Sequence, residues 1–241
     1  MGAAETGLPG LDEVHVWHAE LDVAPGALAD LERTLEPAER ERAGRFHRPL
    51  HRDRYVASRA ALRRILGLTL GRAPESIRFG AGPHGKPRLE PPEADLRFNL
   101  SHAGGHALVA AATGREVGVD LEDPGREVEV DAIVRRFFGP AERAALLGLA
   151  EERRRAAFFQ AWVRKEAWLK AMGRGLSGGL ATHEVPADPR LVAAPLLSPE
   201  PGAAPWFLVR LDLVPGFSAA LVVEGGSVRV LPRRLASSAP R

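Results

Sequence analysis

The chain has 241 residues, of which 45% are hydrophobic, enough for one large domain or two small ones, and its formal net charge is only +2. The absence of cysteine excludes disulfides, thiolate nucleophiles and cysteine-bound zinc, so any metal must have oxygen or histidine ligands, which favours a hard ion such as Mg²⁺. No apolar run approaches the roughly 20 residues of a membrane span, and residues 1–11 lack the layout of a secretory signal. We therefore expect a cytoplasmic protein that enters no membrane and whose small charge does not require a nucleic acid.

The first half of the sequence predicts a strand, then helices, then further strands. Apolar and polar residues alternate from Val14 to Leu21, which is typical of a strand, and Asp53 to Leu66 has an apolar period near 3.6, which indicates a helix. The elements expected are a strand at 14–21, helices at 30–35, 37–45 and 53–66, a glycine-rich loop at 77–86, and strands at 98–101 and 107–113.

Two carboxylates follow in the next segment. Gly114 and Arg115 predict a turn of a hairpin that leads into a strand at 116–122. Alternate side chains of a strand share a face, so Asp120 and Glu122 should lie together, opposite a hydrophobic layer. Such a pair is tolerated mainly where a cation lies between the carboxylates, or on an exposed edge strand.

The second half predicts helices and a late pair of strands. The pattern is helical from 130 to 171 with a break near Gly139 and Pro140. A loop at 187–205 and strands at 207–214 and 218–223 should follow, and the tail after about residue 232 is expected to be disordered. The two halves look alike in outline, without a repeat at the level of residues.

Glu166 and Lys170 are four residues apart and should share one helix face. This spacing also occurs on many solvated helices, and it gains weight from the acidic pair upstream. Arginines are concentrated between residues 33 and 64, where they fit either a phosphate-bearing partner or a solvated helix face.

Four segments occur in a characteristic order: Gly85-Lys86-Pro87, Phe98-Asn-Leu-Ser-His102, Gly118-Val-Asp-Leu-Glu122 and Trp162-Val-Arg-Lys-Glu-Ala167. Together they resemble the 4′-phosphopantetheinyl transferases of the long single-chain type. The resemblance implies an α/β (α+β) fold of two similar subdomains related by pseudo-twofold symmetry, at 1–115 and 116–241. It further implies a monomer with its site in the cleft between them.

The activity implied by this resemblance is the Mg²⁺-dependent transfer of 4′-phosphopantetheine from coenzyme A to a serine of apo acyl or peptidyl carrier proteins. Adenosine 3′,5′-bisphosphate is released, and Mn²⁺ is expected to substitute for Mg²⁺. The acceptors would belong to polyketide, nonribosomal peptide or fatty-acid synthases. The sequence does not distinguish among these acceptors.

The resemblance also assigns roles to single residues. Asp120, Glu122 and Glu166 match the metal ligands, with Asp120 and Glu166 also catalytic, and Glu166 is the general base that relies on position more than on basicity. Lys170 would stabilise or protonate the leaving group. The residues matched to coenzyme A binding are Arg42, Arg54, Lys86, Ser101, His102 and Lys170.

Further positions are less strictly defined by the pattern. Glu39 stands where the family has a basic residue, so either Arg40 replaces that contact or it is lost. Glu142 matches an acid near the metal but also suits a helix cap. Lys165 is interpreted as a solvated neighbour or a secondary phosphate contact. We interpret Trp162 and Trp168 as core residues without a chemical role, and Gly173-Arg-Gly-Leu176 matches the turn after the catalytic helix.

Carrier proteins are acidic, so a basic and partly apolar surface is expected to dock them. Arg135, Arg136 and the Phe137-Phe138 pair are the candidates. Two other functions fit parts of the sequence: a binding module for coenzyme A that transfers nothing, and a nucleic-acid-binding protein based on the arginines at 33–64. The first would lack one of the four charged site residues, and the second would show an aromatic platform that this sequence lacks.

Overall fold

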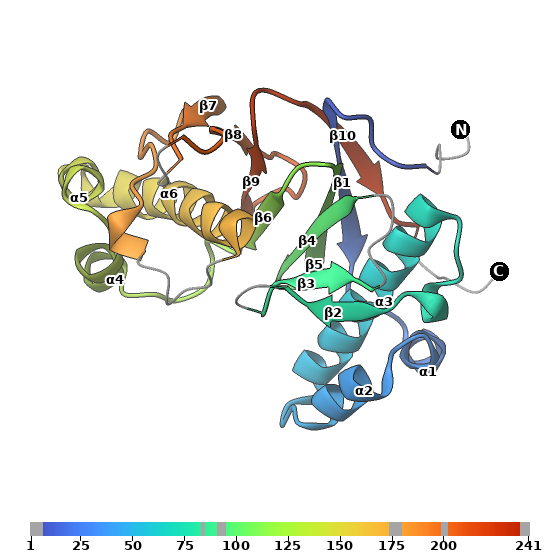
Figure 1. Cartoon of the computed structure of the whole chain (residues 1–241). Helices are drawn as coiled ribbons and strands as arrows, with labels where there is room; N and C mark the ends of the chain where they lie inside the picture. The colour runs from blue at the N-terminus through green and yellow to red at the C-terminus, as the bar shows by residue number, and fades with distance from the viewer. Residues whose placement is uncertain (1–6, 83–84, 91–94, 174–179, 199–201, 237–241) are drawn as a thin grey trace.

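The computed structural model describes residues 7–82, 85–90, 95–173, 180–198 and 202–236. Two four-stranded sheets pack face to face, and one 22-residue helix covers the outer face of each (Figure 1). The molecule is therefore layered as helix, sheet, sheet and helix. Within the described residues, no helix is both long and apolar enough to span a membrane.

The first sheet has the strand order β10-β1-β5-β4. Its strands are β1 (Glu13–Glu20), β4 (Leu96–Ala103), β5 (His106–Thr113) and β10 (Arg229–Arg234). Trp17, Phe98 and Val109 pack against Leu62 and Leu66 of the covering helix α3 (Pro49–Leu70). The remaining elements of this half are α1 (Pro25–Arg33), α2 (Pro37–Gly44), the 3₁₀ turn η1 (Pro74–Ser76), and the hairpin of β2 (Phe79–Ala81) and β3 (Pro87–Leu89).

The second sheet has the order β6-β9-β8-β7. Its strands are β6 (Val117–Glu122), β7 (Ala193–Leu196), β8 (Trp206–Arg210) and β9 (Ser218–Glu224), and the helices of this half are α4 (Val130–Phe137), α5 (Pro140–Leu147), α6 (Glu151–Met172) and the short η3 (Leu180–Thr182). Helix α6 covers the sheet closely at Gly118, where a Cβ atom would lie 2.1 Å from the carbonyl oxygen of Ala167. Glycine at 118 is therefore what allows β6 to approach this helix.

Both halves repeat one topology. In the first, β1 is followed by α3, β4 and β5, and the strands lie in the order β1-β5-β4; in the second, β6 is followed by α6, β8 and β9, in the order β6-β9-β8. The inner faces of the two sheets share one core, which includes Val14, Leu108, Val119 and Leu221. The fold is therefore the α/β arrangement of two similar halves that the sequence predicted.

Several predicted elements were wrong in detail. The segment 77–86 contains strand β2 of a short hairpin, and the segment 187–205 contains strand β7. The turn at Gly114 does not close a hairpin, because β6 leaves the first sheet and pairs with β9 of the second. The predicted helix at 30–35 is shifted, since α1 begins at Pro25.

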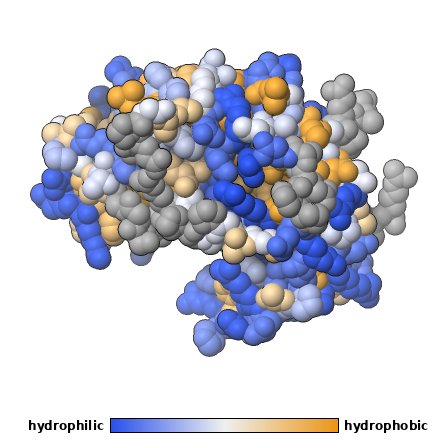
Figure 2. Space-filling model, viewed as in Figure 1, coloured by the Kyte–Doolittle hydropathy of each residue, from blue (hydrophilic) through white to orange (hydrophobic). Residues whose placement is uncertain are grey.

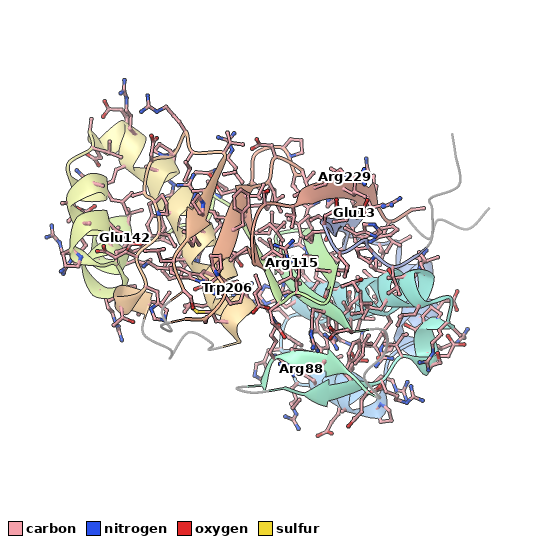
Figure 3. The ribbon with its side chains drawn as sticks, turned by 45° about the horizontal axis from the view of Figure 1, so that its top comes forward. Glu13, Arg88, Arg115, Glu142, Trp206 and Arg229 are labelled. Atoms are coloured by element: carbon pink, nitrogen blue, oxygen red, sulfur yellow. The ribbon has the colours of Figure 1, made fainter. Side chains whose placement is uncertain are left out.

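The prediction of a disordered tail after residue 232 was also wrong for the part that the structure describes. Strand β10 pairs in parallel with β1, so that Glu13 lies opposite Arg229 and their side chains form an ion pair (Figure 3). Pro232 is exposed on this outermost strand, where a missing N–H donor does no harm. Residues 237–241 lie outside the described part of the chain.

Candidate active site

A hydrogen-bonded network joins three elements where the two halves meet. The ammonium group of Lys170 on α6 lies 2.6 Å from Oδ1 of Asp120 on β6 and donates to Oγ of Ser101 on β4 at 2.9 Å. The Ser101 hydroxyl donates to the same Asp120 oxygen at 2.8 Å. Asp120 and Ser101 are buried, so these charged and polar groups lie in a region of low solvent access. The structure thus brings together three residues that lie far apart in the sequence.

Glu166 lies one helical turn before Lys170 and is only 8% exposed. Burial, and then the negative charge of Asp120, raise the pKa of its carboxyl group to about 7, with a smaller contribution from Glu122 and an opposing one from Lys170. The sequence did not predict this raised pKa, and the role of Glu166 as a general base stays a prediction. In the free protein its basicity is matched to neutral pH.

Glu122 is partly buried and is held by two side chains. Arg126 lies 3.0 Å from its Oε2, and the indole N–H of Trp162 donates to its Oε1 at 3.2 Å. Burial and the charge of Asp120 raise the pKa of the Glu122 carboxyl group. Trp162 packs among Phe137, Phe138 and Phe158, as predicted for a core residue, but its hydrogen bond to a site carboxylate was not foreseen.

The chemistry of these three carboxylates fits a divalent cation. All candidate donors are oxygens, and Oδ2 of Asp120 is buried without a hydrogen-bond partner. The raised pKa values of Glu122 and Glu166 both have Asp120 as a cause, which shows that the three negative charges act on one another. As the described side chains stand, however, no group of three or more histidines and carboxylates is arranged to hold a metal ion.

Two of the predicted phosphate ligands lie near the network. His102 follows Ser101 on β4 and has an exposed side chain. Partial burial, then Lys170, then Arg42 lower the pKa of its imidazole, so Arg42 of α2 and Lys170 of α6 both act on it. Figure 2 shows a predominantly hydrophilic surface over the lower part of the molecule, where α2 lies in Figure 1.

Arg54 is already paired in this structure. Its guanidinium group binds Asp22 through two hydrogen bonds, of 2.7 and 2.9 Å. Asp22 is exposed, so the pair lies at the surface. A contact of Arg54 with a phosphate remains a prediction, and the phosphate would have to displace or share this aspartate.

Lys86 is partly buried, with its side chain only 8% exposed, and it joins the two halves. Its ammonium group donates to Oε2 of Glu116 at 2.6 Å and to the carbonyl oxygens of Val117 at 3.0 Å and Ala171 at 2.9 Å. These three bonds use all three N–H donors of an ammonium group. The predicted phosphate contact of Lys86 is untested, and it would require one of these bonds to be exchanged.

The structure explains why an acid, Glu39, stands where the resemblance implies a basic residue. Its carboxylate lies 2.6 Å from Arg59 and 2.7 Å from the fully buried Arg63, and it also accepts the backbone N–H of Glu36 at the start of α2. Arg40 donates to the carbonyl oxygen of Leu35. Glu39 therefore points into the first half and compensates the charges of two arginines.

The interpretation of Lys165 as a solvated residue was wrong. Lys165 is 0% exposed, forms a 2.8 Å ion pair with Glu142, and donates to the carbonyl oxygens of Leu180 and His183. Glu142, labelled in Figure 3, accepts the backbone N–H groups of Gly139 and Val185 with the same carboxylate. Its capping use is thus established, and it anchors α5 to the segment after η3.

Sequence reasoning also passed over Asn99, whose side chain accepts the backbone N–H of Val119 at 2.9 Å. A signal was present, because Asn99 and Ser101 are polar residues at alternate positions of the predicted strand and therefore share one of its faces. Of the turn predicted at 173–176, only Gly173 is described. It ends α6 in the left-handed conformation with φ of 69°.

Comparison with known proteins agrees with this layout. The profile described as "4'-phosphopantetheinyl transferase superfamily" matches residues 116–222, and that described as "4'-phosphopantetheinyl transferase, N-terminal" matches residues 24–114. A holo-[acyl-carrier-protein] synthase structure from Thermotoga maritima aligns with 47% of this chain and 64% of that chain, at 23% identity and a TM-score of 0.29.

Similarity to curated proteins extends over most of the sequence. The chain is 39% identical to the 4′-phosphopantetheinyl transferase HetI of Nostoc over 218 residues, which cover 89% of each protein. It is 28% identical to the 4′-phosphopantetheinyl transferase Sfp of Bacillus subtilis over 63% of this chain and 66% of that protein. On this coverage and identity, the chain belongs to the 4′-phosphopantetheinyl transferases and is an enzyme of that class.

Proposed function

We propose that this enzyme transfers 4′-phosphopantetheine from coenzyme A to a serine of apo acyl or peptidyl carrier proteins in a Mg²⁺-dependent reaction. The observation that carries the proposal is the convergence of Asp120, Glu166 and Lys170 between the two halves, with His102 and Arg42 beside them. Coenzyme A brings several phosphate charges, and this site supplies cationic donors next to a base.

The acceptor hydroxyl must lose its proton as it attacks phosphorus. Glu166 is suited to take that proton, because it lies beside Asp120 and because, in the metal-free protein, burial raises the pKa of its carboxyl group to about 7, above that of an exposed glutamate. The serine oxygen then forms a bond to the pyrophosphate phosphorus that carries pantetheine. The bond from that phosphorus to the bridging oxygen breaks, and adenosine 3′,5′-bisphosphate leaves.

Charge builds up on the departing phosphate oxygen, and Lys170 is the cationic side chain placed to stabilise it. Its ammonium group is held by Asp120 and Ser101, so its position is fixed before any substrate arrives. His102 and Arg42 would bind the 3′-phosphate, because the field of Arg42 reaches the imidazole. A bound phosphate would in turn raise the pKa of His102.

Asp120, Glu122 and Glu166 would hold the Mg²⁺ ion, which when bound neutralises pyrophosphate charge and acts as a Lewis acid. The free protein is prepared for such an ion by its unpartnered Asp120 oxygen and by the mutual repulsion of its carboxylates. Mn²⁺, which prefers similar oxygen ligands, is expected to substitute.

The acceptors we propose are carrier domains of polyketide, nonribosomal peptide or fatty-acid synthases, docked on the exposed end of α4. Arg135 and Arg136 are exposed there, and Arg136 lies over the ring of the half-buried Phe137. Phe138 was part of the predicted patch, but it is 1% exposed and belongs to the core. Reversal of both arginine charges should raise the KM for the carrier, and an unchanged KM would exclude this surface.

We also propose that the enzyme is a cytoplasmic monomer with subdomains at 1–115 and 116–241. Strand β10 departs from this division, because it follows the second subdomain in sequence but completes the sheet of the first. The support for a monomer is that one chain supplies all members of the network, from β4, β6 and α6. The profile matches meet between residues 114 and 116, which supports the division. Equilibrium sedimentation with and without coenzyme A would test the oligomeric state.

Intact-mass spectrometry of apo carrier proteins tests the reaction directly. Incubation with the enzyme, coenzyme A and Mg²⁺ should add one phosphopantetheine unit, and chelator should prevent the addition. The variant Glu166→Gln should be inactive, whereas Glu152→Gln, the same change at the exposed start of α6, should match the wild type. No addition to several acyl and peptidyl carriers, despite measurable coenzyme A binding, would refute the proposed function.

A further inference from the structure

Among the described strands, β6, which carries Asp120, has a hydrogen-bonded neighbour on one edge only. It pairs with β9, and the bond from Glu224 N–H to the Glu116 carbonyl shows that even-numbered residues of this segment face β9. Backbone groups of successive residues point to opposite edges, so Val117, Val119 and Leu121 direct theirs away from β9. On that side lies β4, which packs beside β6 but belongs to the other sheet.

Side chains of the first half form three hydrogen bonds with this open edge. Lys86 donates to the carbonyl oxygen of Val117 at 3.0 Å. Oδ1 of Asn99 accepts the N–H of Val119 at 2.9 Å, and Oγ of Ser101 accepts the N–H of Leu121 at 3.2 Å. Side chains therefore take the place of a neighbouring strand, since each buried N–H needs an acceptor.

The two acceptor residues on β4 have the same spacing as the two amides that they bind on β6. Asn99 and Ser101 are two residues apart, as are Val119 and Leu121, and Asp120 lies between the two bonded amides. Ser101 also contacts the carboxylate of Asp120 directly. Among the described residues, the side-chain hydrogen bond of Asn99 goes only to the backbone of Val119, so it acts on the carboxylate through the strand.

We propose that Asn99 is a positioning residue for the transfer reaction, which fixes the backbone of β6 directly before Asp120 and thereby the distances from the Asp120 carboxylate to Ser101 and Lys170. The inference rests on the proposed function in its catalytic part. Loss of the acceptor would leave the Val119 amide buried and unpaired. The strand could then shift relative to β4 at the point where the 2.6 and 2.8 Å contacts must be kept.

The register supplies a matched pair of variants. Because Ser101 reaches Leu121 with a hydroxyl oxygen, a serine at position 99 is expected to reach Val119 in the same way, whereas alanine differs from it by that one oxygen. We expect Asn99→Ala to lower kcat at least 10-fold with the KM for coenzyme A changed less than threefold. We expect Asn99→Ser to restore kcat to within threefold of the wild type.

A purely structural role gives a different pattern. In that case Asn99→Ala would melt at a lower temperature while the folded protein kept its kcat, and the inference would be wrong. Equal activity of both variants, whether high or low, would also overturn it, because the acceptor oxygen would then not matter.

Amide hydrogen exchange of Val119 gives a second readout without any substrate. The amide should be protected in the wild type and in Asn99→Ser and should exchange at least 10-fold faster in Asn99→Ala. If Asn99→Ala does not fold, the comparison of the wild type with Asn99→Ser remains, and an unprotected Val119 in either contradicts the inference. This readout separates a failure of the inference from a failure of the proposed transfer reaction.

Discussion

Replacing Glu166 by glutamine should stabilise the free protein at alkaline pH while abolishing its activity. The pKa of this carboxyl group is 4.5 in an ordinary setting and about 7 in the fold, so the folded state binds the proton more tightly. The stabilisation by that proton is complete below pH 4.5 and is lost as the pH rises through 7. Glutamine removes the buried charge while keeping the shape of the side chain.

The size of the effect follows from the same shift. At 1.36 kcal/mol for each pKa unit, ionisation of Glu166 costs up to about 3 kcal/mol above pH 7, with little screening because the side chain is 8% exposed. For a chain of this length the gain in Tm of Glu166→Gln at pH 8 should be roughly 6–12 °C. At pH 5 the gain should fall to about a quarter of that at pH 8, because the wild-type carboxyl group is then protonated in the fold, and only its ionisation in the unfolded chain still costs the wild type stability.

The assay is thermal unfolding at pH 5 and pH 8 in the presence of a chelator. A matched control is Glu142→Gln, another buried carboxylate, which should destabilise the protein at pH 8 because it leaves Lys165 buried without its counter-charge. Addition of Mg²⁺ should stabilise the wild type and not Glu166→Gln. The reasoning is refuted if Glu166→Gln is no more stable than the wild type at pH 8, or gains equally at both pH values.

Two further predictions concern parts of the first half away from the network. Glu39→Gln should lower the free energy of unfolding by about 3–5 kcal/mol, since Arg63 loses its buried partner. The KM for coenzyme A should stay within twofold of the wild type. A raised KM together with unchanged unfolding in denaturant would contradict the structural role of Glu39. Below pH 6.5 the stability of the fold should fall because of two histidines. Burial and Arg233 lower the pKa of His15, against Glu13, while burial, His106 and Arg234 lower the pKa of His18, against Glu20. The unfolded chain therefore binds more protons than the folded one in this pH range. Denaturant unfolding at pH 5 and 7.5 checks this, and a smaller pH dependence in His15→Gln is expected, whereas no change would argue against it.

The sequence predicted a residue's burial and contacts where these follow from the local pattern of its strand or helix. The face shared by Val117, Val119 and Leu121 follows from strand alternation alone, and these residues do form the core between the sheets. The pairing of Glu166 with Lys170 on one helix face was equally local. The fold class, by contrast, was predicted through the family resemblance that the ordered motifs carry.

The sequence did not predict the burial, pairing or pKa of residues whose surroundings come from elements distant in the chain. Lys165 and Glu166 are neighbours on one helix, yet the lysine is completely buried by the segment around Leu180 and His183. Strand β10 contains three arginines and a proline in six residues, a composition typical of a tail, and becomes a strand only because β1 offers it an unpaired edge. The raised pKa of Glu166 likewise depends on a fold that buries it beside Asp120.

The parallel pairing of β10 with β1 also has a consequence for how the chain folds during synthesis. The ion pair of Glu13 with Arg229 spans 216 residues of sequence, so the first sheet cannot gain its fourth strand until residues 229–234 have left the ribosome. Until then the edge of β1 is open to pairing with other strands, which is a route to aggregation. Strand β10 therefore completes a sheet whose strand β1 was synthesised long before it.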